Sequence, residues 1–360
     1  LDLVALATVA DVVPLTGLNR AYVTKGLAVM RERQNVGLRA LGDAAGLSEA
    51  PNAYHLGFIL GPRINAGGRI GDAALGAKLL STDDEGEAVR IAAVLDRLNK
   101  ERKEIEQAAL EEAVAMADRM LEEDAGLSVL MVGSPGWHRG VVGLIASRIT
   151  ERFKRPSCVI AWDQAAAGGV VSGTGSLRSV AGIDIGAAVR QAVAAGHLIK
   201  GGGHAMAAGL TVDRAKLEDL KQFFASALGN AAIRLSERAS LAVDGALTPS
   251  AVNDTLIELL ERAGPYGQGN PQPRFVFPAH RVKFAKPVGT AHIRCVLEAG
   301  DGSRLDAVAF RAAGQPLGDL LTAASGGLPV HVAGQLRRDT WGGRNRIELQ
   351  IEDAADPRQQ

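Results

Sequence analysis

The feature that most constrains the fold is an uninterrupted stretch from Asp83 to Asp124 that contains no proline and one early glycine. Its apolar residues recur three, four or seven positions apart, which is the spacing of one helix face. These residues are Val94, Leu98, Ile105, Ala109, Ala113, Met116 and Met120. A helix of about 40 residues extends roughly 60 Å at 1.5 Å per residue. Because so long an element more often joins two domains than lies inside one, we expect residues 83–124 to form a connecting helix.

Length and composition bound the class of protein. A chain of 360 residues exceeds one typical core, so we expect two or three domains. Hydrophobic residues at 47% and charged residues at 22% are typical of a soluble globular protein. No apolar stretch approaches the roughly 20 residues that cross a bilayer, and the N-terminus lacks a secretory pattern. We therefore expect a cytoplasmic location and no membrane partner.

The two cysteines, Cys158 and Cys295, stand far apart and form no zinc-type spacing. We expect both to be buried thiols.

We expect residues 1–82 to be the end of an α/β domain, because apolar runs alternate with Gly and Pro breaks. The run "LDLVALATVA" is strand-like and would end at Asp11. The segment "GPRINAGGR" would be a glycine-rich loop before a short helix. Since the chain opens on an apolar segment with no Met, we expect it to begin in the middle of a domain.

Residues 125–235 show a compact alternation of strands and helices. The segments "SVLMVG" and "PSCVIAW" read as strands, and "GGVVSGTGS" reads as a strand that enters a loop. The segments "GVVGLIASRITERF", "GIDIGAAVRQAVAA" and "KLEDLKQFFASAL" read as helices. This order predicts an α/β domain in which helices cover a sheet.

Residues 236–360 contain five short β-rich segments separated by Gly, Asp or Pro turns, which predicts a small β-barrel, with the oligonucleotide-binding (OB) fold as one candidate. The formal net charge of the chain is zero, but residues 274–346 hold eleven Lys or Arg against five Asp or Glu. Aromatic residues of this barrel are candidates for stacking on bases, although most should be core. They are Phe275, Phe277, Phe284, Phe310 and Trp341.

Two candidate ligand sites lie in the first 82 residues. Asp11 ends a strand-like run, where open α/β sheets place ligand-binding groups, so its carboxylate is a candidate metal ligand; a helix cap or a turn is the alternative. Arg63, Asn65 and Arg69 surround glycines, and guanidinium groups beside exposed amides suit a phosphodiester. A helix-entry loop with solvated arginines is equally compatible.

Two further candidates lie in the α/β domain. His138 precedes a helix, where amide donors and the helix dipole favour an anion, although a surface histidine is the commoner outcome. The segment "SGTGSLRS" contains Ser176, Arg178 and Ser179 among hydroxyl donors without acids. Because no neighbouring base activates a serine, the segment is more typical of a pocket for a terminal phosphate than of a nucleophile. A hairpin turn is the alternative.

The segment "IKGGGHAMAAG" places Gly201, Gly202 and Gly203 directly before His204. Glycine permits both unusual backbone angles and close approach of another group, so the segment is either a tight turn or a ligand cradle. Three glycine-bearing segments that also carry Arg, His or hydroxyl groups, followed by a basic β domain, favour a phosphodiester substrate and single-stranded nucleic acid in particular.

Six ordered motifs resemble the RecJ family of single-strand-specific 5′-to-3′ exonucleases, in the DHH phosphoesterase superfamily. They are "LATVADVVPL", "GPRINAGGRI", "WHRGVVGLIASRI", "SGTGSLRS", "GGGHAMAAG" and "GPYGQGNPQPRF". The resemblance implies the end of a DHH catalytic domain in residues 1–82, a connecting helix in 83–124, a DHHA1 domain in 125–235 and an OB barrel in 236–360. It also implies a role in DNA repair and recombination.

The resemblance further implies hydrolysis with two divalent cations, Mn²⁺ or Mg²⁺. Asp11 matches the last metal-ligand carboxylate of the DHH domain, which makes it a catalytic residue. Ser176 and Arg178 match a loop that grips the 5′ phosphate, and Arg63 and Arg69 match a backbone-binding loop.

The glycine-histidine segment matches a signature that faces the active cleft. The resemblance therefore implies that the backbone of residues 201–203 approaches the DNA. His204 would act on the scissile or a neighbouring phosphate as a hydrogen-bond donor and not as a metal ligand.

The chain departs from the family in lacking the Asp-rich motif, the following single Asp and the Asp-His-His triplet, since none of its histidines are adjacent. One carboxylate cannot build a two-metal site, so we expect these 360 residues alone to be inactive. The expected partners are single-stranded DNA, a single-strand-binding protein and a helicase, with a monomeric state. The alternatives are a non-catalytic single-strand-binding module and a small-nucleotide phosphodiesterase of the same superfamily.

Overall fold

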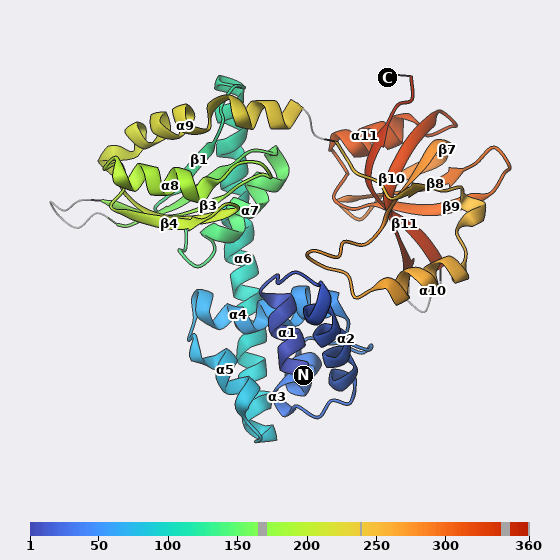
Figure 1. Cartoon of the computed structure of the whole chain (residues 1–360), viewed down its shortest axis with the longest axis horizontal. Helices are drawn as coiled ribbons and strands as arrows, with labels where there is room; N and C mark the ends of the chain where they lie inside the picture. Colours follow the sequence, from blue (N-terminus) through green and yellow to red (C-terminus); the bar gives the residue numbers. More distant parts are fainter. Residues whose placement is uncertain (165–170, 238–239, 340–345, 359–360) are drawn as a thin grey trace. The chain divides into compact units, whose positions relative to one another are not determined.

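The structure, a computed structural model, describes residues 1–164, 171–237, 240–339 and 346–358 (Figure 1). The chain divides into two compact units. The first consists of Leu1–Val29, Pro51–Leu56 and Ser240–Gln360, and the second of Met30–Ala50 and Gly57–Ala239. In the part of the chain that the structure describes, no helix is long and apolar enough to cross a membrane.

The predicted long helix is confirmed as α6, Glu85–Glu123, which lies within the second unit (Figure 1). The side chain of Asp84 caps its N-terminus by accepting the amide hydrogen of Glu87. The N-terminal part of α6 packs against helices α3 (Val36–Ala44), α4 (Gly61–Ile70) and α5 (Ala74–Ser81). Its C-terminal part packs against α7 (Val142–Phe153) and strand β1 (Leu130–Ser134). One helix therefore carries two groups of elements within this unit.

The first residues are helical, so the prediction of a strand before Asp11 is wrong. Helix α1 spans Asp2–Ala10, and α2 (Gly17–Arg31) and a π-helix (His55–Leu60) follow. Ala and Leu, which recur in this run, have the highest helix propensities, and the run contains no Gly or Pro. An apolar run of this length fits a helix and a buried strand equally well by pattern alone.

The prediction that "GPRINAGGR" is a loop is also wrong, because these residues form α4. Pro62 lies in the first turn, where a missing N–H costs nothing. A Cβ at Gly67 would lie 2.5 Å from the carbonyl oxygen of Asp72. Gly67 is therefore required by a close backbone contact of the helix and does not form a turn.

The sheet of the second unit has the strand order β1-β2-β3-β5-β4. Its other strands are β2 (Ser157–Trp162), β3 (Ser172–Arg178), β4 (Lys200–His204) and β5 (Ala207–Asp213). Strands β1 and β2 are parallel and the remaining pairs are antiparallel. Helices α8 (Ile185–Ala194) and α9 (Leu217–Glu237) cover one face, with a 3₁₀ turn at Arg214–Lys216. Helices α6 and α7 cover β1 and β2 on the other face. The predicted sheet and helices are confirmed.

Two predicted irregular segments of this domain are strands instead. The residues "SGTGSLR" form β3, and "KGGGH" forms β4. Glycines are rare in strands, which is why the sequence favours a loop or turn there. In β3 they are needed because a Cβ at Gly173 would lie 2.5 Å from Ile160, and one at Gly175 2.6 Å from Leu210.

The first unit contains the predicted barrel. Strands β7 (Arg274–Val288), β8 (His292–Glu298), β9 (Arg304–Ala309), β10 (Pro329–Asp339) and β11 (Arg346–Ala355) close through pairing of β10 with β7. Helix α11 (Pro316–Ala323) lies between β9 and β10 in sequence, and β9 pairs with β11 in parallel. This is the topology of an OB barrel. Strand β6 (Gly245–Ala246), a 3₁₀ turn (Pro249–Ala251) and α10 (Asp254–Ala263) precede it.

Some of the aromatic residues predicted to stack on bases lie in the core of the barrel, and others are exposed on its surface. Phe277 is fully buried and Phe275 packs against the barrel core, so the stacking prediction for these two is not supported. Phe284 and Phe310 are each 40% exposed. Trp341 lies outside the described residues. The cysteines are buried as predicted, and burial raises the pKa of the Cys158 thiol to about 12.

Two motifs of the first unit that are far apart in sequence bind each other. The amide of Leu15 donates to the carbonyl of Gln268 at 2.6 Å, and Leu15 is buried. The guanidinium of Arg20 donates to the carbonyl of Gly264 at 2.9 Å. The segment "GPYGQGN" therefore holds the turn that follows Asp11.

This docking yields a prediction for Gly267, where an added Cβ would lie 2.8 Å from the Cδ1 atom of buried Leu15. We expect Gly267→Ala to lower the free energy of unfolding by about 1–3 kcal/mol through overpacking. Gly300→Ala is the control, because no heavy atom lies within 4 Å of its Cβ position. Urea denaturation monitored by circular dichroism measures both, and an equal effect of the two variants would contradict the docking role.

Candidate functional site

Helix α4 and the loop between β1 and α7 meet around Gly140. The amide of Gly140 donates to Nδ1 of His138 at 3.0 Å, and its carbonyl accepts from Nη1 of Arg69 at 3.0 Å. A Cβ at Gly140 would lie 2.8 Å from the carbonyl carbon of Arg69. The glycine is required by this close approach, which brings the predicted residues Arg69 and His138 together. Because Nδ1 of His138 accepts a hydrogen bond, the proton of a neutral imidazole lies on Nε2.

The first turn of α7 packs against β3 in a similar way. The Cβ position of Gly143 lies 3.1 Å from Oγ of Ser176 and 3.2 Å from Nη2 of Arg178. Nη1 of Arg178 donates to Oγ of Ser176 at 3.1 Å and to the carbonyl of Leu177 at 2.8 Å. The structure therefore places the predicted pair Ser176 and Arg178 next to each other, in a position that a side chain at residue 143 would disturb.

The electrostatics of this region show an excess of positive charge. Burial lowers the pKa of Arg178, and the nearby charge of Arg69 lowers it further. Burial and the charge of Arg102 lower the pKa of Arg69, while Glu106 opposes the shift. Both guanidinium groups remain charged at neutral pH because arginine pKa values lie so high. Half-buried like charges destabilise each other, so an anion bound between them would be strongly stabilised.

Arg102, on α6, is not among the residues that the sequence predicts for the site. It forms an ion pair with Glu106, and its Nη2 donates to the side chain of Asn99 at 2.9 Å. Its buried Nε has no hydrogen-bond partner within the described part of the chain. We define the guanidinium cluster as Arg69, Arg102 and Arg178; Glu106 is the one carboxylate that contributes to its pKa shifts.

Beside this cluster, three strands present a face made of small residues. The pairing places Ser176 opposite Gly209 and Gly209 opposite Gly202. The next aligned row is Arg178, Ala207 and His204. Directly opposed residues point to the same side of a sheet. Since a Cβ at Gly202 would meet no atom within 4 Å, and one at Gly209 only a carbonyl at 3.9 Å, the backbone is open there. We call these two rows the glycine face.

The three consecutive glycines differ in what requires them. A Cβ at Gly201 would lie 2.7 Å from Val189 on α8, and one at Gly203 would lie 2.5 Å from the Cα atom of Ala208. Packing excludes side chains at these two positions. Only Gly202 has free space above it. The tight-turn interpretation of the segment is wrong, because the glycines lie in a strand. The ligand cradle stays a prediction, and Gly202 is the one glycine of the three at which a ligand could approach the backbone.

His204 ends β4 with an exposed side chain. Its backbone is held because the Cβ position of Gly186, at the start of α8, lies 2.7 Å from the carbonyl oxygens of both Gly203 and His204. Nη1 of Arg190 also donates to the carbonyl of Gly203 at 2.9 Å. The imidazole makes no hydrogen bond to any residue that the structure describes. It is therefore free to act as a donor to a ligand.

Two predicted site residues are engaged in internal contacts. Arg63 donates to Oδ1 of Asp96 at 2.9 Å and to the carbonyl of Ile59 at 2.8 Å. Although burial opposes it, hydrogen bonds from Lys100 and Arg63 hold the pKa of Asp96 below its ordinary value. The buried hydroxyl of Ser179 donates to the carbonyl of Ile183 at 2.8 Å. These contacts explain both side chains without a ligand.

Asn65 lies on the exposed side of α4, four residues before Arg69. Residues four apart share a helix face, so Asn65 lies on the face that carries Arg69. Among the residues that the structure describes, no contact assigns the amide of Asn65 a further role.

Asp11 belongs to the other unit, and its exposed side chain follows the last turn of α1. The next residue, Val12, has φ 57°. The amides of Val12 and Val13 donate to the carbonyls of Val9 and Thr8. This is a Schellman motif, in which glycine normally occupies the left-handed position. A β-branched residue there is strained, and such strain is more common at functional sites than elsewhere.

The donors present do not fit a two-metal centre. Among the described residues, no group of three or more His, Cys, Asp or Glu side chains is arranged to hold a metal ion. Asp11 supplies one carboxylate, whereas each divalent cation of such a centre takes several oxygen ligands.

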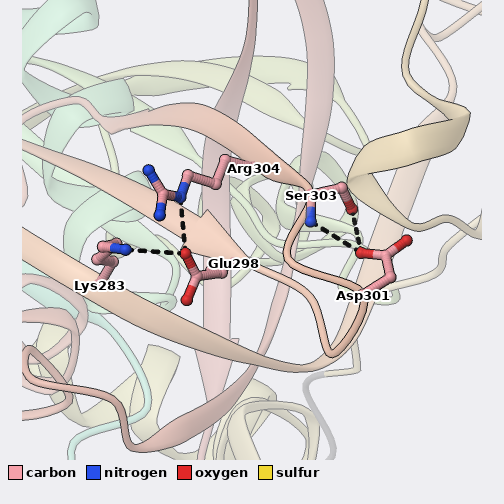
Figure 2. Close-up of polar contacts among 5 residues, drawn as sticks. All are labelled: Lys283, Glu298, Asp301, Ser303 and Arg304. Atoms are coloured by element: carbon pink, nitrogen blue, oxygen red, sulfur yellow. Dashed lines mark hydrogen bonds and ion pairs between the residues drawn. The ribbon is translucent and has the colours of Figure 1, made fainter.

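The basic excess of the barrel is mostly neutralised by internal ion pairs. Figure 2 shows Glu298 accepting from both Lys283 at 3.0 Å and Arg304 at 2.6 Å. Asp306 lies 3.8 Å from both Arg294 and Arg346. Arg274 pairs with Glu352, Arg337 with Glu348, and Arg338 with Asp254 and Glu261. Of the basic residues at 274–339 and at 346, those without an ion pair in the described structure are Arg281, Lys286 and Arg311.

Sequence reasoning missed five residues of this region, which are Arg102, Glu106, Gly140, Gly143 and Gly209. Arg102 and Glu106 lie inside the long helical pattern, where charges are usually solvated, so no local signal distinguishes them. Two of the glycines carry a signal, because Gly140 and Gly143 stand within "HRGVVG", beside a predicted anion site.

Family models match two parts of the chain. The model of the DHHA1 domain matches residues 124–230, and the model of the RecJ OB domain matches residues 243–353.

Relatives match it almost throughout. The chain is 37% identical over 358 residues to the single-stranded-DNA-specific exonuclease RecJ of Dickeya dadantii, covering 98% of this chain and 60% of that protein. It is 39% identical over 317 residues to the Escherichia coli protein of the same name, covering 86% of this chain and 54% of that protein. The chain therefore spans between half and two thirds of the length of these relatives.

Solved structures agree with this similarity. The crystal structure of RecJ from Thermus thermophilus in complex with Mn²⁺ matches with a TM-score of 0.78 and 31% identity, covering 99% of this chain and 49% of that one. The structure of the same protein in complex with Mg²⁺ gives the same TM-score and identity.

The difference between the three glycines yields a prediction about stability. We expect Gly202→Ala to leave the free energy of unfolding unchanged or slightly higher, since an alanine fits the open space and restricts the unfolded chain. Gly201→Ala should lower it by about 1–3 kcal/mol through collision with Val189. Thermal denaturation of both variants checks the difference; comparable losses would show that packing requires Gly202 as well.

Proposed function

We propose that the chain is the substrate-binding portion of a single-stranded-DNA-specific 5′-to-3′ exonuclease. It contains a DHHA1 domain and a RecJ OB domain and is similar to the C-terminal portion of RecJ proteins. The observation that carries the proposal is the guanidinium cluster beside the glycine face. The cluster has more positive than negative charge, and Ser176 adds a hydroxyl donor.

The guanidinium cluster supports recognition of a 5′-terminal phosphate. A terminal phosphate has three non-bridging oxygens and a charge of about −1.5 to −2 at neutral pH, whereas an internal phosphodiester has two such oxygens and a charge of −1. Arg69 and Arg178 offer planar forks of N–H donors, and the hydroxyl of Ser176 lies 3.1 Å from Arg178. Because the second charge is present only at a strand end, this site would favour the end over the interior. On a strand whose phosphate is at the 5′ end, that preference would favour a 5′-to-3′ direction.

The glycine face supports contact with the adjoining backbone of the strand. Gly202 and Gly209 allow a sugar-phosphate chain to lie directly on the sheet, and His204 at the end of the second row would donate to a phosphate. In the other unit, the exposed Phe284 and Phe310 would stack on bases. Lys286 lies 6.0 Å from the ring of Phe284, and Arg337 lies 4.7 Å from that of Phe310.

Hydrolysis by two Mn²⁺ or Mg²⁺ ions is proposed by analogy with the related structures named above, and Asp11 would be one ligand. Since the donors described here do not fit such a centre, we assign no catalytic step to these residues. We propose that the 360 residues bind DNA but do not cut it. Release of nucleotides from a 5′-phosphorylated strand by the purified chain with Mn²⁺ would contradict this. Roles in repair and recombination, a cytoplasmic location, a monomeric state, and a single-strand-binding protein and a helicase as partners belong to the same proposal.

A second candidate is a single-strand-binding module without catalysis. The observation that favours it is the lack of a metal-binding group among the described residues. The two functions differ in whether a preference for the 5′ phosphate exists, since a simple binding module gains nothing from reading the strand end.

Arg178→Ala tests the terminal-phosphate site. We expect the chain to bind a 5′-phosphorylated thymidine oligonucleotide more tightly than its 5′-hydroxyl counterpart, and the variant to lose that difference. One charged hydrogen bond is worth about 1.5–3 kcal/mol, or roughly ten- to hundredfold in affinity. Fluorescence anisotropy measures both ligands. Arg148→Ala, an exposed arginine paired with Glu151 on α7, is the control; equal loss of affinity for both ends in Arg178→Ala would refute the assignment.

The ion pairs of the barrel give a prediction about salt. Replacing an unpaired cation that contacts a phosphate should reduce the slope of log affinity against log salt by about 0.7 for a single strand. We expect this reduction for Lys286→Ala and Arg311→Ala. Arg304→Ala should leave the slope unchanged, since Arg304 is already paired with Glu298. Titrations between roughly 50 and 200 mM salt check this; a larger change for Arg304→Ala would mean that the ion pairs open on DNA.

A further inference from the structure

Strand β1 forms one edge of the sheet and, in the part of the chain that the structure describes, pairs only with β2. The amide of Leu130 donates to the carbonyl of Pro156 on the β2 side at 3.0 Å. Because main-chain groups alternate in direction along a strand, Met131 and Gly133 direct their N–H and C=O groups away from β2. Such a row of unpaired groups is a template for another strand.

A cavity of about 440 Å³ lies along this edge. It is lined by the C-terminal part of α6, by β1 and β2, and by the first turns of α9. The apolar lining consists mainly of Met116, Met120, Met131, Ile160, Trp162 and Leu217. Methionine side chains adapt to different partners because they are unbranched and polarizable.

The two sides of β1 belong to different cores. Leu130 and Val132 pack with α6 and α7, whereas Met131 packs with α8 and α9. A strand added beside β1 would therefore direct alternate side chains toward Met116 and Met120 on one side and toward Leu217 on the other. Both faces of the added strand would be buried, so successive apolar residues suit it better than an alternating pattern.

The charges at the rim of the cavity favour an acidic ligand. Arg119 has no ion pair among the described residues, and Lys221 has only an exposed pair with Glu218 at 3.1 Å. Exposed pairs of this kind are weak. Glu123 is the one acidic side chain of the lining, so positive charge predominates.

We propose that the β1 edge binds an extended peptide segment of a partner protein as an added strand. The segment carries four or five apolar residues, to match the five residues of β1, and has acidic residues at its ends. Main-chain hydrogen bonds to Met131 and Gly133 supply affinity, and the methionine-lined walls and the two cations supply specificity. Strand β1 lies at the edge of the sheet opposite β4, so this site is separate from the glycine face and does not depend on the proposed nuclease role.

The probe is a fluorescein-labelled synthetic peptide, Asp-Asp-Val-Leu-Val-Leu-Val-Asp-Asp, with a control peptide in which the central Val is replaced by Pro. Proline removes an amide donor and disrupts strand pairing. We expect the probe to bind the chain in fluorescence anisotropy and to slow hydrogen exchange of the amides of Met131 and Gly133. The proline peptide should bind at least tenfold more weakly.

Two variants complete the test. Arg119→Glu should weaken binding about fivefold, because an attraction becomes a repulsion. Arg90→Glu reverses the charge of an exposed side chain near the start of the same helix, and it should have no effect on peptide binding. Lack of protection at the two amides with 1 mM peptide, equal effects of both variants, or protection of the same amides by a thymidine oligonucleotide would each overturn the proposal. Circular dichroism of the variants confirms that any loss is not unfolding.

Discussion

The repulsion between Arg69 and its two neighbours, Arg102 and Arg178, is the constraint on which the rest of the candidate site depends. Half-buried cations near one another are unfavourable, so other contacts must hold them in place. The carbonyl of Gly140 anchors Arg69, Glu106 pairs with Arg102, and Ser176 and Leu177 accept from Arg178. The three arginines come from α4, α6 and β3. Helix α4 packs against α6, an apolar core joins α6 to α7, and α7 packs against β3, so these elements are held relative to one another. The stability of that core maintains an unsatisfied positive charge that an anion can neutralise.

The glycines that surround the cluster have two different physical roles. Gly140 and Gly186 let backbone segments approach so closely that no side chain fits, and thereby fix the backbone positions of Arg69 and His204. Gly143 leaves room for the side chains of Ser176 and Arg178. Gly202 and Gly209 have open space above them and leave the sheet bare. The first group builds the site and the second leaves room for what binds to it. The segment "GGGH" contains both kinds of glycine. Gly201 and Gly203 are required by close contacts, whereas Gly202 has open space above it.

Much of the fold follows from patterns that single sequences carry well. The long helix has sustained apolar periodicity, and the barrel strands have alternating residues and clear turns. The first helix is not predictable in this way, because its short apolar run has no distinctive period and fits a strand as well. Strands β3 and β4 resemble loops in sequence because glycine disfavours strands, and only packing against Ile160, Leu210 and Val189 shows why glycine is needed.

The sequence predicts which types of residue form the site, but it does not predict which individual residues belong to it. Arg63 and Arg69 are alike in sequence, yet Arg63 pairs with Asp96 while Arg69 joins the cluster. The partner of each is distant in sequence, so only the tertiary structure separates them. The basic excess of the barrel misleads in part for the same reason. The acids that pair with Arg274, Arg337 and Arg338 lie outside the basic segment 274–346, and they are Glu352, Glu348, Asp254 and Glu261.

We propose that the guanidinium cluster binds a doubly charged terminal phosphate. Phosphorus NMR of a 5′-phosphorylated oligonucleotide bound to the chain measures the second pKa of that phosphate, which is about 6 when free. Two adjacent guanidinium groups stabilise the dianion, so we expect a pKa clearly below this value in the complex. If the terminal phosphate of the bound oligonucleotide titrates as it does in free solution, the guanidinium cluster does not bind it.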